Sequence, residues 1–447
     1  MKTREDIYNL CQQALELCKP YPAEALVISA QNALTRFANN FIHQNVSEDN
    51  TILYLRLLSG KRIGAASTNR VDSAGLIELS NRARQNAQTG PENPRFPGFL
   101  ESAAYAAIAA FDLPTADLSP RLRAEQVRSV CNLAAEEGLN ASGAFSSGND
   151  QMAVANTHGI FTYHASTHAD FQVVAMAPDS SGHAHASAWR VADIPVEALA
   201  REALQKAKLG SNPREISPGE YCVVLDAYAT QDILAMLNWH GMGAQSVMEG
   251  RSWMNGHMGE KVMDSRVDIW DDGLDLAGKP APFDYEGVPK QHVDIVRAGV
   301  ATAPVHDRRT AHEAGVSSTG HALHPNLHGL SPLASNLFLS PGESSLEEMI
   351  KATRRGLYIT RFWYTRQVYP RGCVITGMTR DGVFWIENGE IAYPVKNLRF
   401  TQSNVDALND VEAIGRETYL LVSEYGNIAC RVPAVKLARF NFTGVTA

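Results

Sequence analysis

The sequence lacks a long apolar run and an excess of positive charge. Its longest apolar stretch, at 103–111, is interrupted by Tyr105 and falls far short of the ~20 residues that a membrane-spanning helix requires. The formal net charge is −8, and lysine and arginine do not cluster, so direct nucleic-acid binding is not expected. The N-terminus has no apolar segment or cleavage site typical of a secretory signal. We therefore expect a cytoplasmic protein without a membrane span.

Cysteine is scarce and follows no metal-binding or disulfide pattern. Six cysteines are scattered without a CxxC spacing, which fits reduced thiols better than a disulfide framework or a zinc ribbon. No serine lies in a GxSxG motif, so nothing marks a serine nucleophile. With 45% hydrophobic and 20% charged residues in 447, the chain is typical of a globular protein of two or three domains.

Two breaks divide the chain into regions of different pattern. A proline-rich connector lies within 91–120, and a second break spans 211–219. Helical periodicity alternates with strand-like segments before the second break, whereas short strands and glycine turns prevail after it. We therefore predict an α+β fold, with an N-terminal mixed α/β region at 1–215 and a mainly antiparallel β domain at 216–447.

Residue spacing and cap residues predict the individual elements. Ser119 is expected to cap a helix that begins at Pro120. The predicted helices span 4–18, 72–88, 120–136, 195–209, 229–245 and 346–355. The predicted strands include 25–31, 34–44, 50–58, 62–66, 152–156, 160–165 and 170–177.

The segment with the clearest chemical meaning is AMLNWHGM at 235–242, on a predicted helix. A glycine-rich segment at 249–262 and an Asp-Asp-Gly turn at 271–273 follow it. This order resembles the TldD/PmbA family, also called modulator of DNA gyrase, whose peptidase subunit carries a HExxxH helix before an equivalent segment. In that motif two histidines bind one zinc ion, and the glutamate activates the bound water.

The resemblance assigns a depleted metal site to this chain. Ala235 and Met236 stand at the positions of the first histidine and the glutamate, and His240 at the second histidine. The family's third ligand, a cysteine, falls on Tyr425, ahead of the Val432–Pro433 step. The resemblance therefore implies a TldE/PmbA-like, metal-free member with no catalytic residue and no cofactor of its own.

Further segments match the family in the same order over most of the chain. They are 36–40, 42–44, 62–69, 156–159, 319–322, 341–345, 356–360, 386–391 and 394–395. Each match alone is short, but their common order supports the family resemblance.

The resemblance also implies a function for the chain. In the family, a metal-bearing subunit and its metal-free relative pair into a dimer around a peptide groove. This chain is then expected to be inactive alone and to bind unfolded peptide beside the zinc of a TldD-like partner, or to pair with itself. Candidate groove residues are His240, His321, Trp363 and Tyr364, because aromatic side chains offer rigid apolar surface at low entropy cost.

Three alternatives remain open. A homodimeric hydrolase could use a relocated metal site in the histidine cluster at 306–328, although Pro325 disfavours a helix that would align these side chains. The chain could also be a peptide-binding or regulatory module without peptidase activity. The cluster comprises His306, His312, His321, His324 and His328. The family's other name suggests modulation of DNA gyrase, which the acidic charge leaves open as an indirect action through proteolysis.

Overall fold

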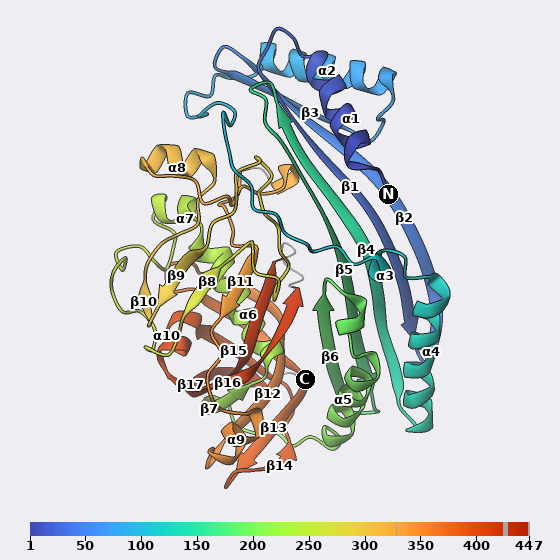
Figure 1. Cartoon of the computed structure of the whole chain (residues 1–447). Helices are drawn as coiled ribbons and strands as arrows, with labels where there is room; N and C mark the ends of the chain where they lie inside the picture. Colours follow the sequence, from blue (N-terminus) through green and yellow to red (C-terminus); the bar gives the residue numbers. More distant parts are fainter. Residues whose placement is uncertain (328, 423–427, 446–447) are drawn as a thin grey trace.

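The computed structural model of the chain consists of two sheet-containing units that lie side by side (Figure 1). It describes residues 1–327, 329–422 and 428–445. A six-stranded sheet in the order β3-β2-β1-β4-β5-β6 forms the N-terminal unit, and an eleven-stranded sheet forms the C-terminal unit. The predicted α+β class and the sheet-rich C-terminal region are confirmed.

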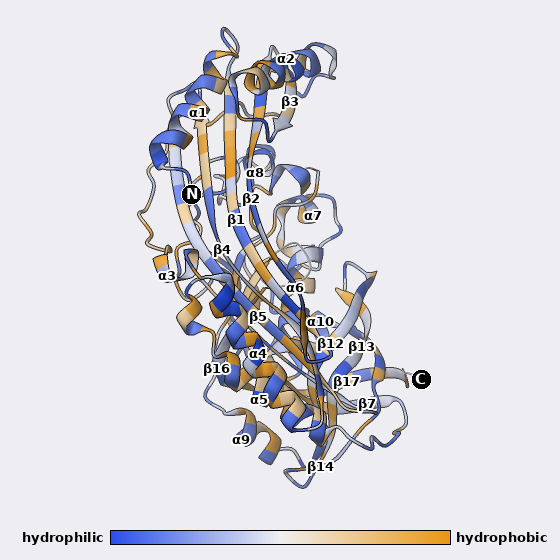
Figure 2. Ribbon diagram, turned by 90° about the vertical axis from the view of Figure 1, so that its right-hand side faces the viewer, coloured by the Kyte–Doolittle hydropathy of each residue, from blue (hydrophilic) through white to orange (hydrophobic). Residues whose placement is uncertain are grey.

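The N-terminal sheet is antiparallel throughout and carries its helices on one face (Figure 1). Hydrophobic and polar residues alternate along its strands (Figure 2), so one face packs against the helices and the other faces the C-terminal unit. The strands are β1 (Ala23–Ala38), β2 (Phe41–Ser59), β3 (Arg62–Thr68), β4 (Asn140–Asn156), β5 (Phe161–Met176) and β6 (Ser181–Ala188). The main helices are α1 (Arg4–Glu16), α2 (Ser73–Thr89), α4 (Pro120–Glu136) and α5 (Val196–Leu209).

Local signals fix several helix starts. Ser119 caps α4 by accepting a hydrogen bond from the Leu122 N–H, and Pro120 is the first helical residue, as predicted. In α1, Thr3 and Asp6 form a capping box. These helices cover two separate apolar clusters on the same sheet face, one beneath α1 and α2 and the other beneath α4 and α5.

The predicted continuous strand at 34–44 is wrong. Asn39 and Asn40 adopt positive φ angles of 52° and 60° and form a two-residue turn, so that β1 and β2 make a hairpin. Asparagine tolerates this left-handed conformation, which a tight hairpin turn requires. The pattern of β-forming residues continues across this turn and therefore does not reveal it.

The C-terminal sheet is mostly antiparallel, with parallel pairs only at β11–β17 and β12–β7 among the described strands. Its strands are β7 (Gly219–Leu225), β8 (Ile269–Asp271), β9 (Val293–Arg297), β10 (Val300–Ala301), β11 (Asn336–Leu339), β12 (Arg355–Tyr369), β13 (Val374–Glu387), β14 (Glu390–Pro394), β15 (Leu398–Ser403), β16 (Val411–Val422) and β17 (Ala429–Val445). Its helices are α6 (Ala227–Leu237), α7 (Ala244–Met248), α8 (Arg308–Ala314), α9 (Leu346–Lys351) and α10 (Asn404–Asn409), and α3 (Leu113–Ala116) lies in the connector of the N-terminal unit.

The predicted helix at 229–245 is interrupted. It ends as α6 at Leu237, passes through a π-helical turn at Asn238–Met242, and resumes as α7 after Gly243. A Cβ atom at Gly243 would lie 1.9 Å from the Pro332 carbonyl oxygen, so the chain needs glycine at this close approach. The predicted helix at 346–355 is also shorter than expected, because it ends as α9 at Lys351 and β12 begins at Arg355.

A buried ion pair joins the two units. Lys206 on α5 places its Nζ 3.1 Å from Oδ2 of Asp226, which caps α6. The same ammonium contacts Glu202, and Tyr358 donates a hydrogen bond to Asp226. This network fixes the start of α6 against the N-terminal unit.

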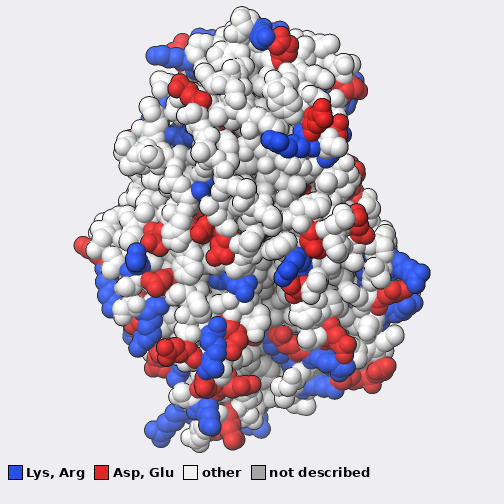
Figure 3. Space-filling view, in the orientation of Figure 1, with Lys and Arg blue, Asp and Glu red and all other residues white. Residues whose placement is uncertain are grey.

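The outer surface shows mixed charge. On the face drawn in Figure 3, acidic and basic side chains are interspersed, so this face of the described chain offers no basic stripe for nucleic acid. In the described part of the chain, no helix is long and apolar enough to cross a lipid bilayer.

Candidate functional site

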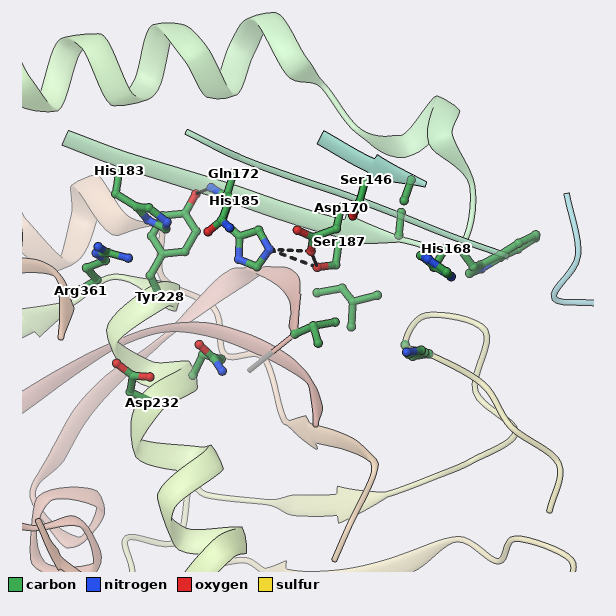
Figure 4. A pocket seen from close by; sticks show the side chains of 18 of the residues that line it. Ser146, His168, Asp170, Gln172, His183, His185, Ser187, Tyr228, Asp232 and Arg361 are labelled. Atoms are coloured by element: carbon green, nitrogen blue, oxygen red, sulfur yellow. Dashed lines mark hydrogen bonds and ion pairs between the residues drawn. The ribbon is translucent and has the colours of Figure 1, made fainter. Parts of the chain in front are cut away.

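A cavity of ≈ 430 Å³ lies between the two units. One wall is the face of β4, β5 and β6 that is turned away from the helices, and the other comes from α6, β12 and β16 (Figure 4). The Lys206–Asp226 ion pair holds the two walls of the cavity together, because Asp226 caps α6, which forms part of the second wall.

The wall of the N-terminal unit is a polar stripe. His183, His185 and Ser187 alternate along β6, so their side chains share one face and line the cavity. Nε2 of His185 lies 2.7 Å from Oδ2 of Asp170 on β5, and the Ser187 hydroxyl donates a hydrogen bond to the same carboxylate. Figure 4 shows these three side chains together at the cavity wall.

Asp170 is held as a carboxylate. Burial raises its pKa, but the neighbouring His185 and the hydrogen bonds from His185 and Ser187 outweigh burial, so the pKa lies below its usual value. Nearby, Nδ1 of His168 lies 3.1 Å from Oδ2 of Asp150. The stripe therefore combines two histidine–carboxylate pairs.

His183 is buried and neutral. Burial, together with the charges of Arg361, His185 and Lys206, holds its pKa well below the usual value. Its ring stands edge-on to the Tyr228 ring, with centroids 5.2 Å apart. Among the described residues, its Nδ1 has no hydrogen-bond partner.

The edge of β6 is partly occupied by side chains of α5 and α6. The Lys206 ammonium donates to the His183 carbonyl oxygen at 3.4 Å, and the His185 N–H donates to the Tyr228 hydroxyl at 3.3 Å. Main-chain groups that would otherwise pair with a further strand are thus used by side chains.

The opposite wall is aromatic and charged. Tyr228, Gln231 and Asp232 lie at helical spacing on one side of α6. Two guanidinium groups lie near Trp363 on β12, since those of Arg361 and Arg380 lie 5.2 Å and 4.6 Å from its ring centre.

Tyr364 is the most exposed aromatic residue of this wall. It has a positive φ of 55°, its side chain is 58% exposed, and the Arg366 guanidinium lies 4.1 Å from its ring centre. Leu420 and Val422 of β16 add apolar surface beside it. Two of the four predicted groove residues, Trp363 and Tyr364, therefore line the cavity.

The other two predicted groove residues lie elsewhere. His321 is fully buried, with Nε2 2.7 Å from Oδ1 of Asp271 and Nδ1 2.9 Å from the Thr319 hydroxyl. Burial would raise the pKa of Asp271, but Lys290 and His321 outweigh it and hold the pKa at about 2. His321 thus belongs to a buried network and does not line the cavity.

The positions that correspond to the family's metal ligands lie in the core of the C-terminal unit. Ala235 is 1% exposed and Met236 4% exposed. Alanine has no donor atom, and a methionine thioether is not among the usual zinc ligands, so these residues do not fit a zinc ion. Tyr425, at the position of the cysteine, lies outside the described residues.

His240 lies in the π-helical turn and is 7% exposed. Its Nε2 is buried and has no hydrogen-bond partner in the part of the chain that the structure describes. Burial and the Arg251 charge lower the pKa of His240 to about 4, so the imidazole is neutral at pH 7.

The histidines at 306–328 are not gathered around one point. His312 is exposed on α8, His321 pairs with Asp271, and His324 stands edge-on to the rings of Tyr54 and Tyr285. His328 lies outside the described residues. Within the described ranges, no three side chains of histidine, cysteine, aspartate or glutamate are placed to hold a metal ion.

Comparison with known proteins places these features in a family. Residues 218–444 match the PmbA/TldA metallopeptidase C-terminal domain, and residues 114–210 match the corresponding central domain. A metalloprotease of Methanothermobacter thermautotrophicus is 26% identical over 331 residues, which cover 72% of each chain. Metalloprotease PmbA of Escherichia coli O157:H7 is 24% identical over 398 residues, which cover 83% of each chain.

Solved structures show the same fold. TldE from Thermococcus kodakarensis superimposes with a TM-score of 0.88 at 18% identity, covering 98% of this chain and 100% of the other. A modulator of DNA gyrase from Thermotoga maritima gives a TM-score of 0.87 at 21% identity, with the same coverage. Because one family domain alone spans half of the sequence, the chain belongs to the PmbA/TldD metallopeptidase family.

Proposed function

We propose that this chain is the non-catalytic, substrate-binding subunit of a TldD/TldE-type zinc metallopeptidase that acts on unfolded peptides in the cytoplasm. The observation that carries the proposal is the burial of Ala235 and Met236 at two metal-site positions of α6, the helix that also lines the cavity. The helix lies beside the cavity, but Ala235 and Met236 have no side-chain group that could bind zinc or activate a zinc-bound water.

The cavity is suited to an extended chain. Among the described strands, β16 pairs only with β17. The segment 342–344 hydrogen-bonds to its other edge at 414–416, whereas the part of this edge after Arg416, which leads to the cavity residues Leu420 and Val422, pairs with no described strand. An unfolded segment can add to such an edge through main-chain hydrogen bonds, while side-chain pockets hold alternate residues. Trp363 and Tyr364 of β12, which line the same cavity, would contact the side chains of the peptide.

Hydrolysis would require a zinc-activated water, which the HExxxH helix of a TldD-like partner would supply. The residues of this chain would then bind the peptide and restrict its path. The Asp170–His185 and Asp150–His168 pairs present polar groups to the peptide backbone and side chains. A folded protein would not fit into a cavity of this size.

A reconstitution experiment tests the proposal. The purified chain, a homologue with an intact HExxxH motif, and their mixture are incubated with an unstructured peptide, and the products are identified by mass spectrometry. We expect cleavage by the mixture to exceed the sum of the separate proteins. Chelator-sensitive cleavage by this chain alone, with stoichiometric zinc bound, would refute the proposal.

The same samples address the alternatives. Peptide binding by the chain alone, with no added cleavage in the mixture, would favour a binding or regulatory module. Metal in the purified protein that is lost in the His321→Ala and His324→Ala variants would favour a relocated metal site.

A further inference from the structure

A second cavity, of ≈ 520 Å³, also lies between the two units. One side is formed by β1, β2 and β3, and the other by the turn at 284–287, the start of α8 and the loop that leads from α8 to β11. In the part of the chain that the structure describes, no residue lines both cavities. Its volume falls within the range of roughly 300–1,000 Å³ that is usual for small-molecule sites.

Two carboxyl groups at this second cavity share one guanidinium group. Arg56 on β2 donates hydrogen bonds from Nε, at 3.0 Å, and from Nη2 to Oε1 of Glu24. Its Nη1 lies 3.1 Å from Oε1 of Glu286. No other lysine or arginine among the described residues forms an ion pair with either carboxyl group. The cluster therefore has one more acidic group than it has basic groups.

Glu24 is the most deeply buried member of this cluster. It is 2% exposed, and its Oε2 has no hydrogen-bond partner among the described residues. Burial raises the pKa of Glu24, and the nearby Glu286 adds to this effect, so Arg56 does not fully compensate the charge. A positively charged hydrogen-bond donor would offset both the missing partner and the excess of negative charge.

The rest of the lining is largely apolar and aromatic. Leu26, Ile63 and Leu323 line the cavity, together with the rings of Tyr54 and Phe96. Aromatic rings attract organic cations, and the Arg56 guanidinium already lies 5.9 Å from the centre of the Phe96 ring. A bare metal ion is not favoured here, because no three histidine, cysteine, aspartate or glutamate side chains of the described chain are placed to hold one.

We propose that this second cavity binds a small organic cation, in which an ammonium or guanidinium group is attached to an apolar body. The charged group contacts Glu24 and Glu286, and the apolar body packs against Leu26, Ile63 and Phe96. A free amine and the basic side chain of a peptide share this chemistry. The inference does not rest on the proposed peptidase role, because the two cavities share no lining residue.

The first test compares probes of similar shape and different charge. Phenylbutylamine, phenylbutanol and phenylbutyrate are titrated into the full chain at pH 7 and followed by isothermal titration calorimetry. We expect the amine to bind one-to-one and at least about tenfold more tightly than the alcohol, because a charge-assisted hydrogen bond is added. Phenylbutyrate should not bind, because its carboxylate would lie beside two others.

The second test removes the charges of the protein. Glu24→Gln and Glu286→Gln keep an oxygen for Arg56, and we expect each to weaken binding of the amine at least about tenfold while the affinity for the alcohol is unchanged. The matched control is Glu313→Gln, whose carboxylate lies 3.6 Å from Nη1 of Arg309 but does not line the cavity. This control should bind the amine like the wild type.

A third variant fills the cavity without changing its charge. Ala65 lies opposite Arg56 on the edge strand β3, is exposed and lines the cavity, so the fold should tolerate a large side chain there. We expect Ala65→Trp to abolish binding of both the amine and the alcohol. Thermal melting followed by circular dichroism establishes that each variant is folded.

Competition with phenylbutylamine distinguishes the two sources of the cation. The competitors are a peptide with one lysine, blocked at both termini, and its norleucine counterpart. Displacement by the lysine peptide alone identifies a peptide side chain as the ligand, whereas displacement by neither identifies a free amine.

Four results would overturn the inference. They are no binding of the amine, equal affinity for amine and alcohol, amine binding that survives both glutamine substitutions, and amine binding that survives Ala65→Trp. Each measurement uses the chain alone and no cleavage assay, so its failure is distinguishable from failure of the proposed function.

Discussion

The Lys206 ammonium lies 3.1 Å from Oδ2 of Asp226 and thereby connects α5 of one unit to the first turn of α6 in the other. Burial alone would lower the pKa of Lys206, but Asp226 and Glu202 outweigh it and raise the pKa above its ordinary value. Both side chains are nearly inaccessible to water, so the loss of Lys206 leaves the buried Asp226 without its cationic partner.

We predict that Lys206→Met lowers the free energy of unfolding by about 3–5 kcal/mol, the usual cost of breaking a buried pair. The matched control is Lys208→Met on the same helix, whose ion pair with Glu137 is largely exposed and should contribute less than about 1 kcal/mol. Urea denaturation followed by circular dichroism measures both. Equal effects of the two substitutions would contradict a special role for the buried pair.

Two tyrosines on β12 offer a test of peptide binding. Tyr364 and Tyr369 are 58% and 52% exposed, but only Tyr364 lines the cavity. We expect Tyr364→Ala to weaken binding of an unstructured peptide about tenfold, because an aromatic contact is lost, and Tyr369→Ala to leave the affinity unchanged. Fluorescence anisotropy with a labelled peptide measures this. If both variants bind like the wild type, the peptide lies elsewhere.

The buried His240 predicts acid sensitivity. Its folded-state pKa of about 4 lies below the ordinary value of 6.5, so between these pH values the unfolded chain binds more protons than the folded chain. The stability of the wild type should therefore fall as the pH decreases from 6.5 towards 4. In His240→Leu this contribution, up to about 3 kcal/mol, should be absent.

Melting temperatures at pH 5 and pH 7 measure the effect, with His257→Leu as a control at an exposed histidine. Zinc content, measured on the same samples, should not change in His240→Leu. A drop in bound metal in that variant would identify His240 as a ligand.

Asp284 predicts a pH dependence of opposite sign. Burial and the nearby Glu286 raise the pKa of Asp284 to about 7. Between its ordinary value of 3.8 and about 7 the folded chain binds more protons, so this carboxyl lowers stability as the pH rises through that interval. We expect Asp284→Asn to flatten the decline in melting temperature from pH 5 to pH 8. Parallel profiles of variant and wild type would contradict this assignment.

Elements with local signals could be predicted from the sequence. Ser119 and Pro120 mark the start of α4 through a cap and a missing N–H, which depend on neighbouring residues only. The interruption between α6 and α7 could not be predicted in this way, because Gly243, which precedes α7, is required by the close approach of the distant Pro332. The point at which the helix resumes thus depends on a tertiary contact.

The cavity shows the same division. Trp363 and Tyr364 were predicted from their residue type, whereas His183 and His185 were not recognised, although the HxHxS alternation at 183–187 indicates one strand face. Asp170, their neighbour on the adjacent strand, also gave no signal on its own. Their significance depends on α6 and β12 lying opposite, and no local pattern reports this pairing.

The occupied edge of β6 has a consequence for any guest strand. Lys206 and Tyr228 already bind the His183 carbonyl and the His185 N–H, so these two groups are not available to a peptide in the cavity. We expect the peptide to add to the larger sheet at β16 and to contact the smaller sheet mainly through side chains. Main-chain hydrogen bonds on the β16 side would then accept peptides of many sequences, and side-chain contacts with the smaller sheet would select among them.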